Sequence, residues 1–168
     1  MRDFTIPILD VYHDSTVDGD GLRSVVFMAG CPHRCIGCHN PESWDASNGT
    51  HWTVQEIFDE LMTNELTDVT FSGGEPMIYA KQLLPLAKAL KEEGKNIWCW
   101  TGYLIEDLKG PQKELLKYID VLVDGPFILE LRDITDNNKF RGSLNQRVFE
   151  LENGEIKKEI YKNGYKKG

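Results

Sequence analysis

Three of the four cysteines in this 168-residue chain lie in one short segment, CPHRCIGCHN. Cys31, Cys35 and Cys38 have the spacing Cys-x3-Cys-x2-Cys, and no fourth cysteine is near them in the sequence. Thiolates grouped in this way bind metal ions or iron–sulfur clusters. A closed tetrahedral metal site needs four ligands. The segment therefore raises the question of what occupies the fourth position.

Two kinds of metal site fit this spacing. Cys31, Cys35 and Cys38 could form a structural Cys3His zinc site with either His33 or His39. Alternatively, they could hold a 4Fe-4S cluster, in which three thiolates leave one iron without a protein ligand. That iron can bind a substrate or cofactor supplied from outside. The spacing alone leaves both alternatives open.

A second candidate site is the turn GGEP at residues 73–76. Two adjacent glycines let the backbone approach a ligand closely, in conformations that other residues avoid. The Glu75 carboxylate that follows them could meet a cationic amino group. Because glycine pairs are common in turns, the motif gains its weight from its position: it follows the next predicted strand after the cysteine segment.

Four apolar runs with β propensity each end at a turn that contains glycine. The runs cover residues 22–29, 68–72, 96–101 and 120–124. The turns that follow them are the cysteine segment, GGEP, TGY and DGPF, in that order. Nearly continuous apolar runs of this length are typical of strands buried on both faces.

Segments with helical periodicity lie between these runs. Residues 53–62, TVQEIFDELM, begin with threonine and glutamate at the spacing of a capping box. Residues 81–94, KQLLPLAKALKEEG, have one apolar face, carry Pro85 near the start and end at a glycine. Residues 111–119 predict a further short helix. The alternation of strands and helices indicates an α/β fold with a parallel sheet.

In such folds the ligand sites gather where the parallel strands end. The order of elements therefore predicts that the cysteines, GGEP, TGY and DGPF surround one cavity. The chain is too short for eight βα units, so we expect a partial, open (β/α) barrel or an open sheet. We expect a single domain over residues 1–168, with a core of about residues 8–150. The lysine-rich tail, residues 151–168, is expected to be a solvated, frayed terminus or a docking segment for an acidic partner.

The composition argues against several classes of function. The formal net charge is −8, which disfavours broad nucleic-acid binding because that requires a basic surface. No apolar run approaches the roughly 20 residues that span a bilayer, and the N-terminus lacks the pattern of a signal peptide. We therefore expect no membrane association and a cytoplasmic protein, in which clustered cysteines stay reduced and are metal-binding or catalytic.

The cysteine segment, followed one strand later by GGEP, resembles the radical S-adenosylmethionine (SAM) enzymes. Residues 18–45 and the later segments WTGY, VLVDGPF and RGSLNQR are similar to the activating enzymes of glycyl radical enzymes. The best match is the activases of anaerobic (class III) ribonucleotide reductase, over about residues 8–149. Asp20 departs from the family by replacing the proline of its D/N-G-P-G start. The residue before the third cysteine is Gly37. Many radical SAM enzymes have an aromatic residue at this position, whereas these activases commonly have glycine.

The resemblance implies a cofactor set and a role for each matching residue. Cys31, Cys35 and Cys38 would hold one 4Fe-4S cluster whose fourth iron chelates SAM. The residues expected to contact SAM are Gly37, Cys38 and His39 near the adenine, Gly73, Gly74 and Glu75 at the methionine moiety, and Thr101 or Gly102 on the ribose side. The remaining cysteine, Cys99, is expected to be a buried strand residue.

The resemblance also implies a reaction and partners. An electron from the cluster would cleave SAM to methionine and a 5′-deoxyadenosyl radical, which would take hydrogen from a glycine of anaerobic ribonucleoside-triphosphate reductase. A flavodoxin or ferredoxin-like protein would donate the electron. Asp124 and residues 141–147 would lie where a partner or substrate could be met. Alternatively, Asp124 would help to form the DGP turn, and the arginines of residues 141–147 would belong to the solvated surface. The alternatives are an activase of another glycyl radical enzyme such as pyruvate formate-lyase, a small radical SAM enzyme acting on a pterin-like metabolite, and a zinc-stabilised interaction module.

Overall fold

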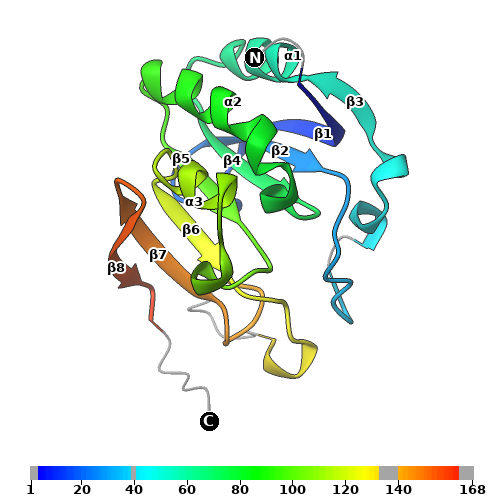
Figure 1. Cartoon of the computed structure of the whole chain (residues 1–168), viewed down its shortest axis with the longest axis vertical. Helices are drawn as coiled ribbons and strands as arrows, with labels where there is room; N and C mark the ends of the chain where they lie inside the picture. Colours follow the sequence, from blue (N-terminus) through cyan, green and yellow to red (C-terminus); the bar gives the residue numbers. More distant parts are fainter. Residues whose placement is uncertain (1–3, 39–40, 133–139, 163–168) are drawn as a thin grey trace.

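A single eight-stranded sheet runs through the protein, as seen in a computed structural model that describes residues 4–38, 41–132 and 140–162 (Figure 1). The strand order is β3-β1-β2-β4-β5-β6-β7-β8. The strands are β1 (Thr5–Ser15), β2 (Arg23–Met28), β3 (Thr50–Thr53), β4 (Asp68–Gly73), β5 (Ile97–Trp100), β6 (Val121–Asp124), β7 (Arg147–Glu152) and β8 (Glu155–Ile160).

The centre of the sheet is parallel. Strands β2, β4, β5 and β6 pair side by side in one direction, and they coincide with the four apolar runs of the sequence. Most of their residues are buried, including all of β6. The predicted α/β class with parallel strands is therefore confirmed, as is the position of each predicted strand.

Antiparallel strands extend the sheet on both sides. β1 pairs with β2, and β3 pairs with β1, while β7 pairs with β6 and β8 with β7. None of these four strands was predicted from the sequence. The sheet is open, because β3 and β8 are at its two ends in the strand order. The result is a mixed α/β sheet.

Three α-helices cover one face of this sheet (Figure 1). They are α1 (Val54–Met62), α2 (Ala80–Glu92) and α3 (Pro111–Leu116). Short 3-10 turns are η1 (Pro41–Trp44), η2 (Ala46–Asn48), η3 (Pro76–Tyr79), η4 (Ile105–Asp107) and η5 (Leu129–Leu131). The predicted capping box of Thr53 and Glu56 is formed, and Gly94 follows α2 with a positive φ of 79°. Pro85 lies inside α2.

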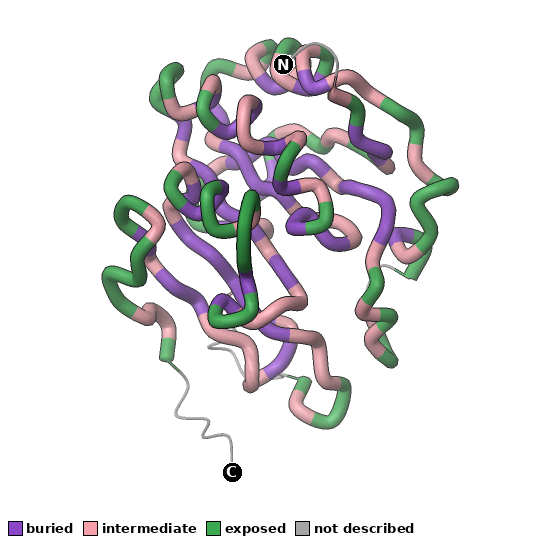
Figure 2. Tube along the Cα trace, viewed as in Figure 1, coloured by how far each residue is buried: buried purple, intermediate pink, exposed green. Residues whose placement is uncertain are grey.

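The sheet separates two hydrophobic clusters. The larger one lies between the sheet and the three helices and includes Phe71, Leu86 and Leu122. The smaller one, around Trp98 and Val123, packs with residues of β8 and with Phe140. Figure 2 shows the buried backbone concentrated in the strands. Because both faces of the central strands are covered, their apolar residues need no alternation with polar ones.

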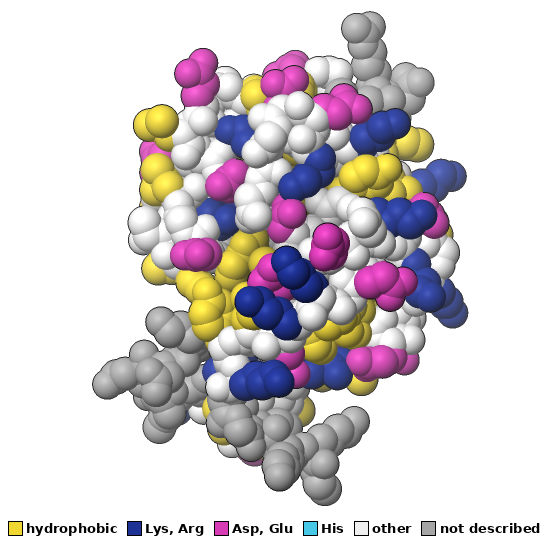
Figure 3. All heavy atoms as spheres, turned by 90° about the vertical axis from the view of Figure 1, so that its left-hand side faces the viewer, with side chains coloured by type: hydrophobic (Ala, Val, Ile, Leu, Met, Phe, Trp, Pro, Cys, Tyr) yellow, Lys and Arg dark blue, Asp and Glu magenta, His cyan; other side chains and the backbone are white. Residues whose placement is uncertain are grey.

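The lysine-rich tail is ordered over most of its described length. β8 is a largely exposed strand at one edge of the sheet, so the expectation of a frayed terminus is wrong for residues 155–160. Lys157 and Lys158 lie 3.5 and 3.7 Å from the carboxylate of Glu150. Figure 3 shows basic and acidic side chains interspersed on the side of the molecule where β8 lies. Residues 163–168 lie outside the described residues.

The sheet also extends beyond the expected core of residues 8–150, because β1 begins at Thr5 and β8 ends at Ile160. Among the helices in the described part of the chain, none has the length and apolar character that crossing a membrane requires.

Candidate functional site

A cavity of about 320 Å³ lies where the four parallel strands end. All four glycine-containing turns contribute to its wall, as the sequence predicted. The lining residues from these turns are Cys31, His33, Cys35 and Cys38, then Gly73 and Gly74, then Thr101 and Gly102, then Gly125 and Phe127. Further lining residues are Asp18, Phe27, Ser43, Trp44, Ser72, Trp100, Gly142 and Gln146.

The start of the cysteine loop is held by backbone hydrogen bonds to its neighbours. The Gly30 N–H donates to Ser43 O at 2.6 Å, and the Cys31 N–H donates to Trp44 O at 3.1 Å. The Glu75 N–H donates to Gly30 O at 2.8 Å. These bonds tie the loop to η1 on one side and to the GGEP turn on the other. The loop therefore starts from a fixed position even though its described residues, 31–38, belong to no helix or strand.

The rest of the loop brings the other two cysteines to the same cavity. The Cys38 N–H donates to Cys35 O at 3.1 Å, which closes a turn between them. Gly37 in this turn has a φ of +77°, a conformation that glycine adopts without steric cost. Burial raises the pKa of the Cys31 thiol, and backbone N–H groups of His33 and Arg34 oppose that rise. All four cysteines are free thiols.

Glu75 is fully buried and is not part of the cavity wall. One carboxylate oxygen accepts hydrogen bonds from His33 Nε2 at 2.6 Å and from the Gly102 N–H at 2.7 Å. The other accepts from the Met77 N–H at 2.9 Å and from the Thr101 hydroxyl at 2.8 Å. The carboxylate therefore does not project into the cavity, in contrast to the expectation that it meets a cationic amino group.

Asp124 is also fully buried and occupied by internal partners. Its carboxylate accepts from Arg147 Nη2 at 2.6 Å and from the Ile105 N–H at 2.8 Å. The hydrogen bond with Asp124, and to a smaller extent that with Glu106, raises the pKa of the Arg147 guanidinium above its ordinary value, although burial opposes the rise. Of the two roles the sequence left open for Asp124, the structure favours the structural one.

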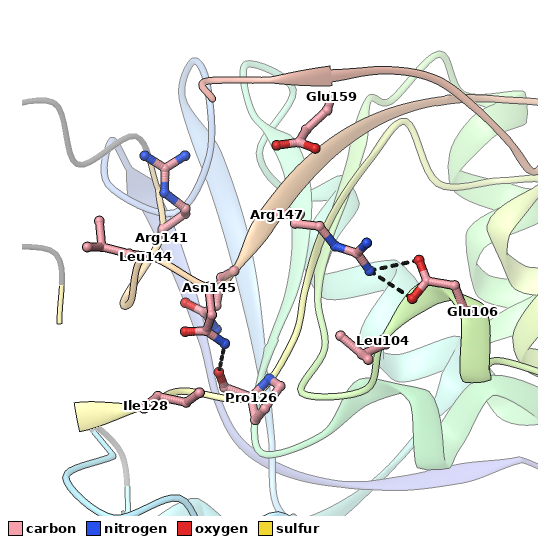
Figure 4. A pocket seen from close by; sticks show the side chains of 10 residues that line it. Leu104, Glu106, Pro126, Ile128, Arg141, Leu144, Asn145, Arg147 and Glu159 are labelled. Atoms are coloured by element: carbon pink, nitrogen blue, oxygen red, sulfur yellow. Dashed lines mark hydrogen bonds and ion pairs between the residues drawn. The ribbon is translucent and has the colours of Figure 1, made fainter. Parts of the chain in front are cut away.

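Residues 141–147 are fastened to the turn after β6. Asn145 Nδ2 donates to Pro126 O at 2.8 Å, and Gln146 Nε2 donates to Gly125 O at 2.9 Å. Figure 4 shows the Asn145 contact and the Arg147–Glu106 ion pair beside a second cavity of about 440 Å³. Asn145 thus lines the second cavity, and Gln146 belongs to the walls of both.

The chemistry of the cavity at the strand ends suits an iron–sulfur cluster and an organic cofactor. Three thiols face it together with apolar and aromatic walls, and the described lining residues include no Lys or Arg. The indole N–H of Trp44, a wall residue, is buried without a hydrogen-bond partner among the described residues, which would suit an acceptor on a bound group. The lack of Lys and Arg among the described lining residues gives no support to an anionic metabolite such as a pterin as the substrate.

A mononuclear zinc site finds no geometric support. Within residues 4–38, 41–132 and 140–162, no three His, Cys, Asp or Glu side chains converge as ligands of one ion. His33, one possible fourth ligand, is hydrogen-bonded to Glu75 instead. His39, the other, lies outside the described residues. The cysteines of a cluster are attached to different irons, so they need not converge on one point.

The structure brings most of the sequence-predicted residues to one cavity. Cys31, Cys35 and Cys38 line it, as do Gly73, Gly74 and Thr101. Gly37 is not among the lining residues; a Cβ added to it would lie 2.8 Å from a methyl carbon of Leu129. The sequence predicted that the DGPF turn, which contains Phe127, lies at the cavity, and that residues 141–147, which contain Gln146, could meet a partner. It assigned no role to Trp44, which lies within residues 18–45, the segment that resembles the activases.

Comparison with known proteins supports the cluster. The profile of the family described as "4Fe-4S single cluster domain" matches residues 17–149. The chain is 38% identical over 151 residues to the anaerobic ribonucleoside-triphosphate reductase-activating protein of Haemophilus influenzae, covering 83% of this chain and 95% of that one. It is 41% identical over 148 residues to the protein of the same name from Vibrio cholerae, covering 82% and 93%.

A solved structure shares the fold. The crystal structure of QueE from Escherichia coli superimposes with a TM-score of 0.51 at 19% sequence identity, over 58% of this chain and 52% of that chain. Identity this low supports only the arrangement of strands and helices.

Proposed function

We propose a function from one premise: this chain belongs to the family of anaerobic ribonucleoside-triphosphate reductase-activating proteins. The proposal is that the protein is a radical SAM enzyme that forms the glycyl radical of anaerobic ribonucleoside-triphosphate reductase. Cys31, Cys35 and Cys38 hold a 4Fe-4S cluster, and SAM occupies the rest of the cavity. The observation that supports this most directly is that three thiols and the GGEP turn share one cavity.

The bound cluster and SAM supply the chemistry: one electron breaks the sulfonium bond to give methionine and a 5′-deoxyadenosyl radical, which takes hydrogen from a glycine Cα. The protein binds, orients and shields these groups. The backbone of Gly73 and Gly74 is proposed to bind the methionine moiety, and Thr101, which also lines the cavity, is proposed to lie on the ribose side. Gly37, Cys38 and His39 are proposed to flank the adenine.

The open sheet suits a protein substrate. In the part of the chain that the structure describes, the three α-helices pack on one face of it, and the cavity lies where the parallel strands end. A loop of the reductase that carries the reactive glycine can then reach the cavity without passing through a closed ring of strands. A flavodoxin or ferredoxin-like donor and a cytoplasmic location, where thiols stay reduced, complete the proposal.

The decisive experiment uses protein reconstituted with iron and sulfide under anaerobic conditions. We expect about four irons per chain, and we expect dithionite and SAM to yield 5′-deoxyadenosine, measured by chromatography. After co-incubation with the anaerobic reductase, an EPR signal of a glycyl radical should appear on the reductase. Zinc bound in place of iron, with no SAM cleavage, would overturn the proposal in favour of an interaction module.

A matched pair of cysteine variants tests the cluster assignment. Cys38→Ala should lose the stable cluster and SAM cleavage, because a loop thiolate is missing. Cys99→Ala should keep both, because Cys99 is buried on β5 away from the cavity wall. If the two variants retained iron and SAM cleavage to the same extent, the loop cysteines would not be the ligands.

A further inference from the structure

The buried Glu75 carboxylate connects three turns that are distant in the sequence. His33 belongs to the cysteine loop, Met77 follows the GGEP turn, and Gly102 belongs to the TGY turn. Each donates a hydrogen bond to this carboxylate, at 2.6, 2.9 and 2.7 Å respectively. With the Thr101 hydroxyl at 2.8 Å, both oxygens are saturated by two donors each. A buried carboxylate needs such partners, because desolvation without them is costly.

His33 is the only link in this network that comes from the cysteine loop, as far as the described residues show. Its side chain sits between Cys31 and Cys35 in sequence and is 17% exposed. The ring also packs edge-on against Tyr103, with ring centres 4.6 Å apart. A Cβ on Gly102 would lie 2.5 Å from the same ring. The ring is therefore clamped against the TGY turn while its nitrogen reaches the carboxylate.

We infer that Glu75 and His33 are positioning residues that set the cysteine loop against the turn that receives SAM. The inference rests on the proposed function, because it assigns the His33–Glu75 hydrogen bond a role in SAM binding. The Glu75 side chain binds the three turns and does not line the cavity. Gly73 and Gly74 are the residues of GGEP that line it. The His33–Glu75 hydrogen bond fixes the position of the cysteine loop relative to the GGEP turn.

The test compares two substitutions that distinguish the contribution of the His33 ring from that of its hydrogen bond. His33→Phe keeps an aromatic ring but removes the donor, whereas His33→Gln keeps an N–H at a similar reach. We expect both proteins to reconstitute with normal iron and sulfide. In His33→Phe, the dissociation constant for SAM should rise about 10–100-fold, the usual range for a lost supporting contact around a metal centre. His33→Gln should stay within about 3-fold of the unsubstituted protein, inside the context-dependent scatter of such contacts.

The SAM-induced change in the EPR spectrum of the reduced cluster provides a second readout. It should be weakened in His33→Phe and retained in His33→Gln. His51→Phe, the same change on the exposed strand β3, should leave both measurements unaltered. Equal SAM affinity in His33→Phe and His33→Gln would overturn the inference, whether both were normal or both were impaired.

Amide hydrogen exchange of the apoprotein tests the His33–Glu75 hydrogen bond without cluster or SAM. Exchange of the peptide that contains residues 31–35 should be faster in His33→Phe than in His33→Gln or His51→Phe. If amide exchange in His33→Phe were unchanged, the claim that His33 anchors the cysteine loop would be wrong, whatever the SAM affinities. If the unsubstituted holoprotein bound no SAM, the proposed function would fail, and this exchange measurement would still decide whether His33 anchors the loop.

Discussion

Gly74 and Gly102 show, at the scale of single residues, why glycine follows the central strands. A Cβ on Gly74 would lie 2.3 Å from Gly30 O, and a Cβ on Gly102 would lie 2.5 Å from the ring of His33. In both cases the obstacle is another turn at the cavity. The sequence suggested that glycines allow close approach to a ligand. The structure adds that they allow the turns to pack against one another.

Cys99 illustrates how burial separates one cysteine from the other three. It has no exposed surface, and burial raises the pKa of its thiol well above the ordinary value, with the Glu75 charge adding to the rise. A raised pKa means less thiolate at any given pH, and the thiolate is the reactive form. Cys99 therefore behaves as a core residue, as the sequence indicated.

We predict that iodoacetamide at about pH 8, near the ordinary pKa of a thiol, alkylates the loop cysteines of the folded apoprotein and leaves Cys99 unmodified. Peptide mapping by mass spectrometry measures the modification at each site. In denaturant all four cysteines should react alike, because the burial that raises the pKa is lost. Alkylation of Cys99 in the folded protein as fast as that of Cys35 would contradict this prediction.

At the scale of elements, a buried ion pair joins the two strands that change the sheet from parallel to antiparallel. Asp124 ends β6, and Arg147 begins β7 opposite it. Arg147 Nη2 also lies 2.9 Å from a Glu106 oxygen, in the loop after β5. The side chain of Asp124 is fully buried, whereas that of Arg147 is 31% exposed. The pair therefore fixes the start of β7 beside the cavity turns.

Replacing Arg147 with methionine should lower the free energy of unfolding by about 2–4 kcal/mol, because Asp124 keeps a buried charge without its partner. This estimate is about 1 kcal/mol below the usual range for a fully buried pair, because Arg147 is partly exposed. Denaturant unfolding of the apoprotein measures the change. Lys157→Met is the matched control: its exposed pair with Glu150 should contribute less than about 1 kcal/mol. Equal losses in the two variants would show that the Asp124 pair has no special role.

At the scale of the whole molecule, one sheet joins the cavity turns to both ends of the described chain. We propose that residues 1–168 form one domain, because the sheet includes strands from Thr5 to Ile160 and has one layer of helices. On the opposite face, residues at the end of β8 pack against the smaller hydrophobic cluster. Ile160 and Tyr161 pack against the cluster of Trp98, Val121, Val123 and Val148.

Two truncations test the contribution of β8. A chain that ends at residue 154 should lose at least about 5 °C in Tm, because the apolar cluster and the edge of β7 become exposed. A chain that ends at residue 162 should keep the Tm of the full chain, since β8 and Tyr161 remain. Thermal unfolding of the apoproteins measures both. Equal Tm values for the two truncated chains would mean that β8 adds nothing to the stability of the fold.

The amino-acid sequence by itself determined the four central strands, the helices between them and the gathering of the cysteine loop with the glycine turns. These features follow from local signals: apolar runs, helical periodicity, a capping box, and turn residues at strand ends. Parallel strand order then placed the turns at one side of the sheet without knowledge of any side-chain contact. The cysteine spacing, three thiols within eight residues, carried the cluster hypothesis in the same local way.

Only the tertiary structure decided the edge strands and the roles of the buried charged residues. Glu75 read as a cofactor ligand in isolation, yet its partners Thr101 and His33 lie 26 and 42 positions away in the chain. Arg147 likewise pairs with Asp124 from 23 positions away. The direction of a buried carboxylate depends on which donors the fold brings within hydrogen-bonding distance, and no local pattern encodes that. Edge strands such as β8, largely exposed and rich in charge, lack the apolar run that identifies central strands.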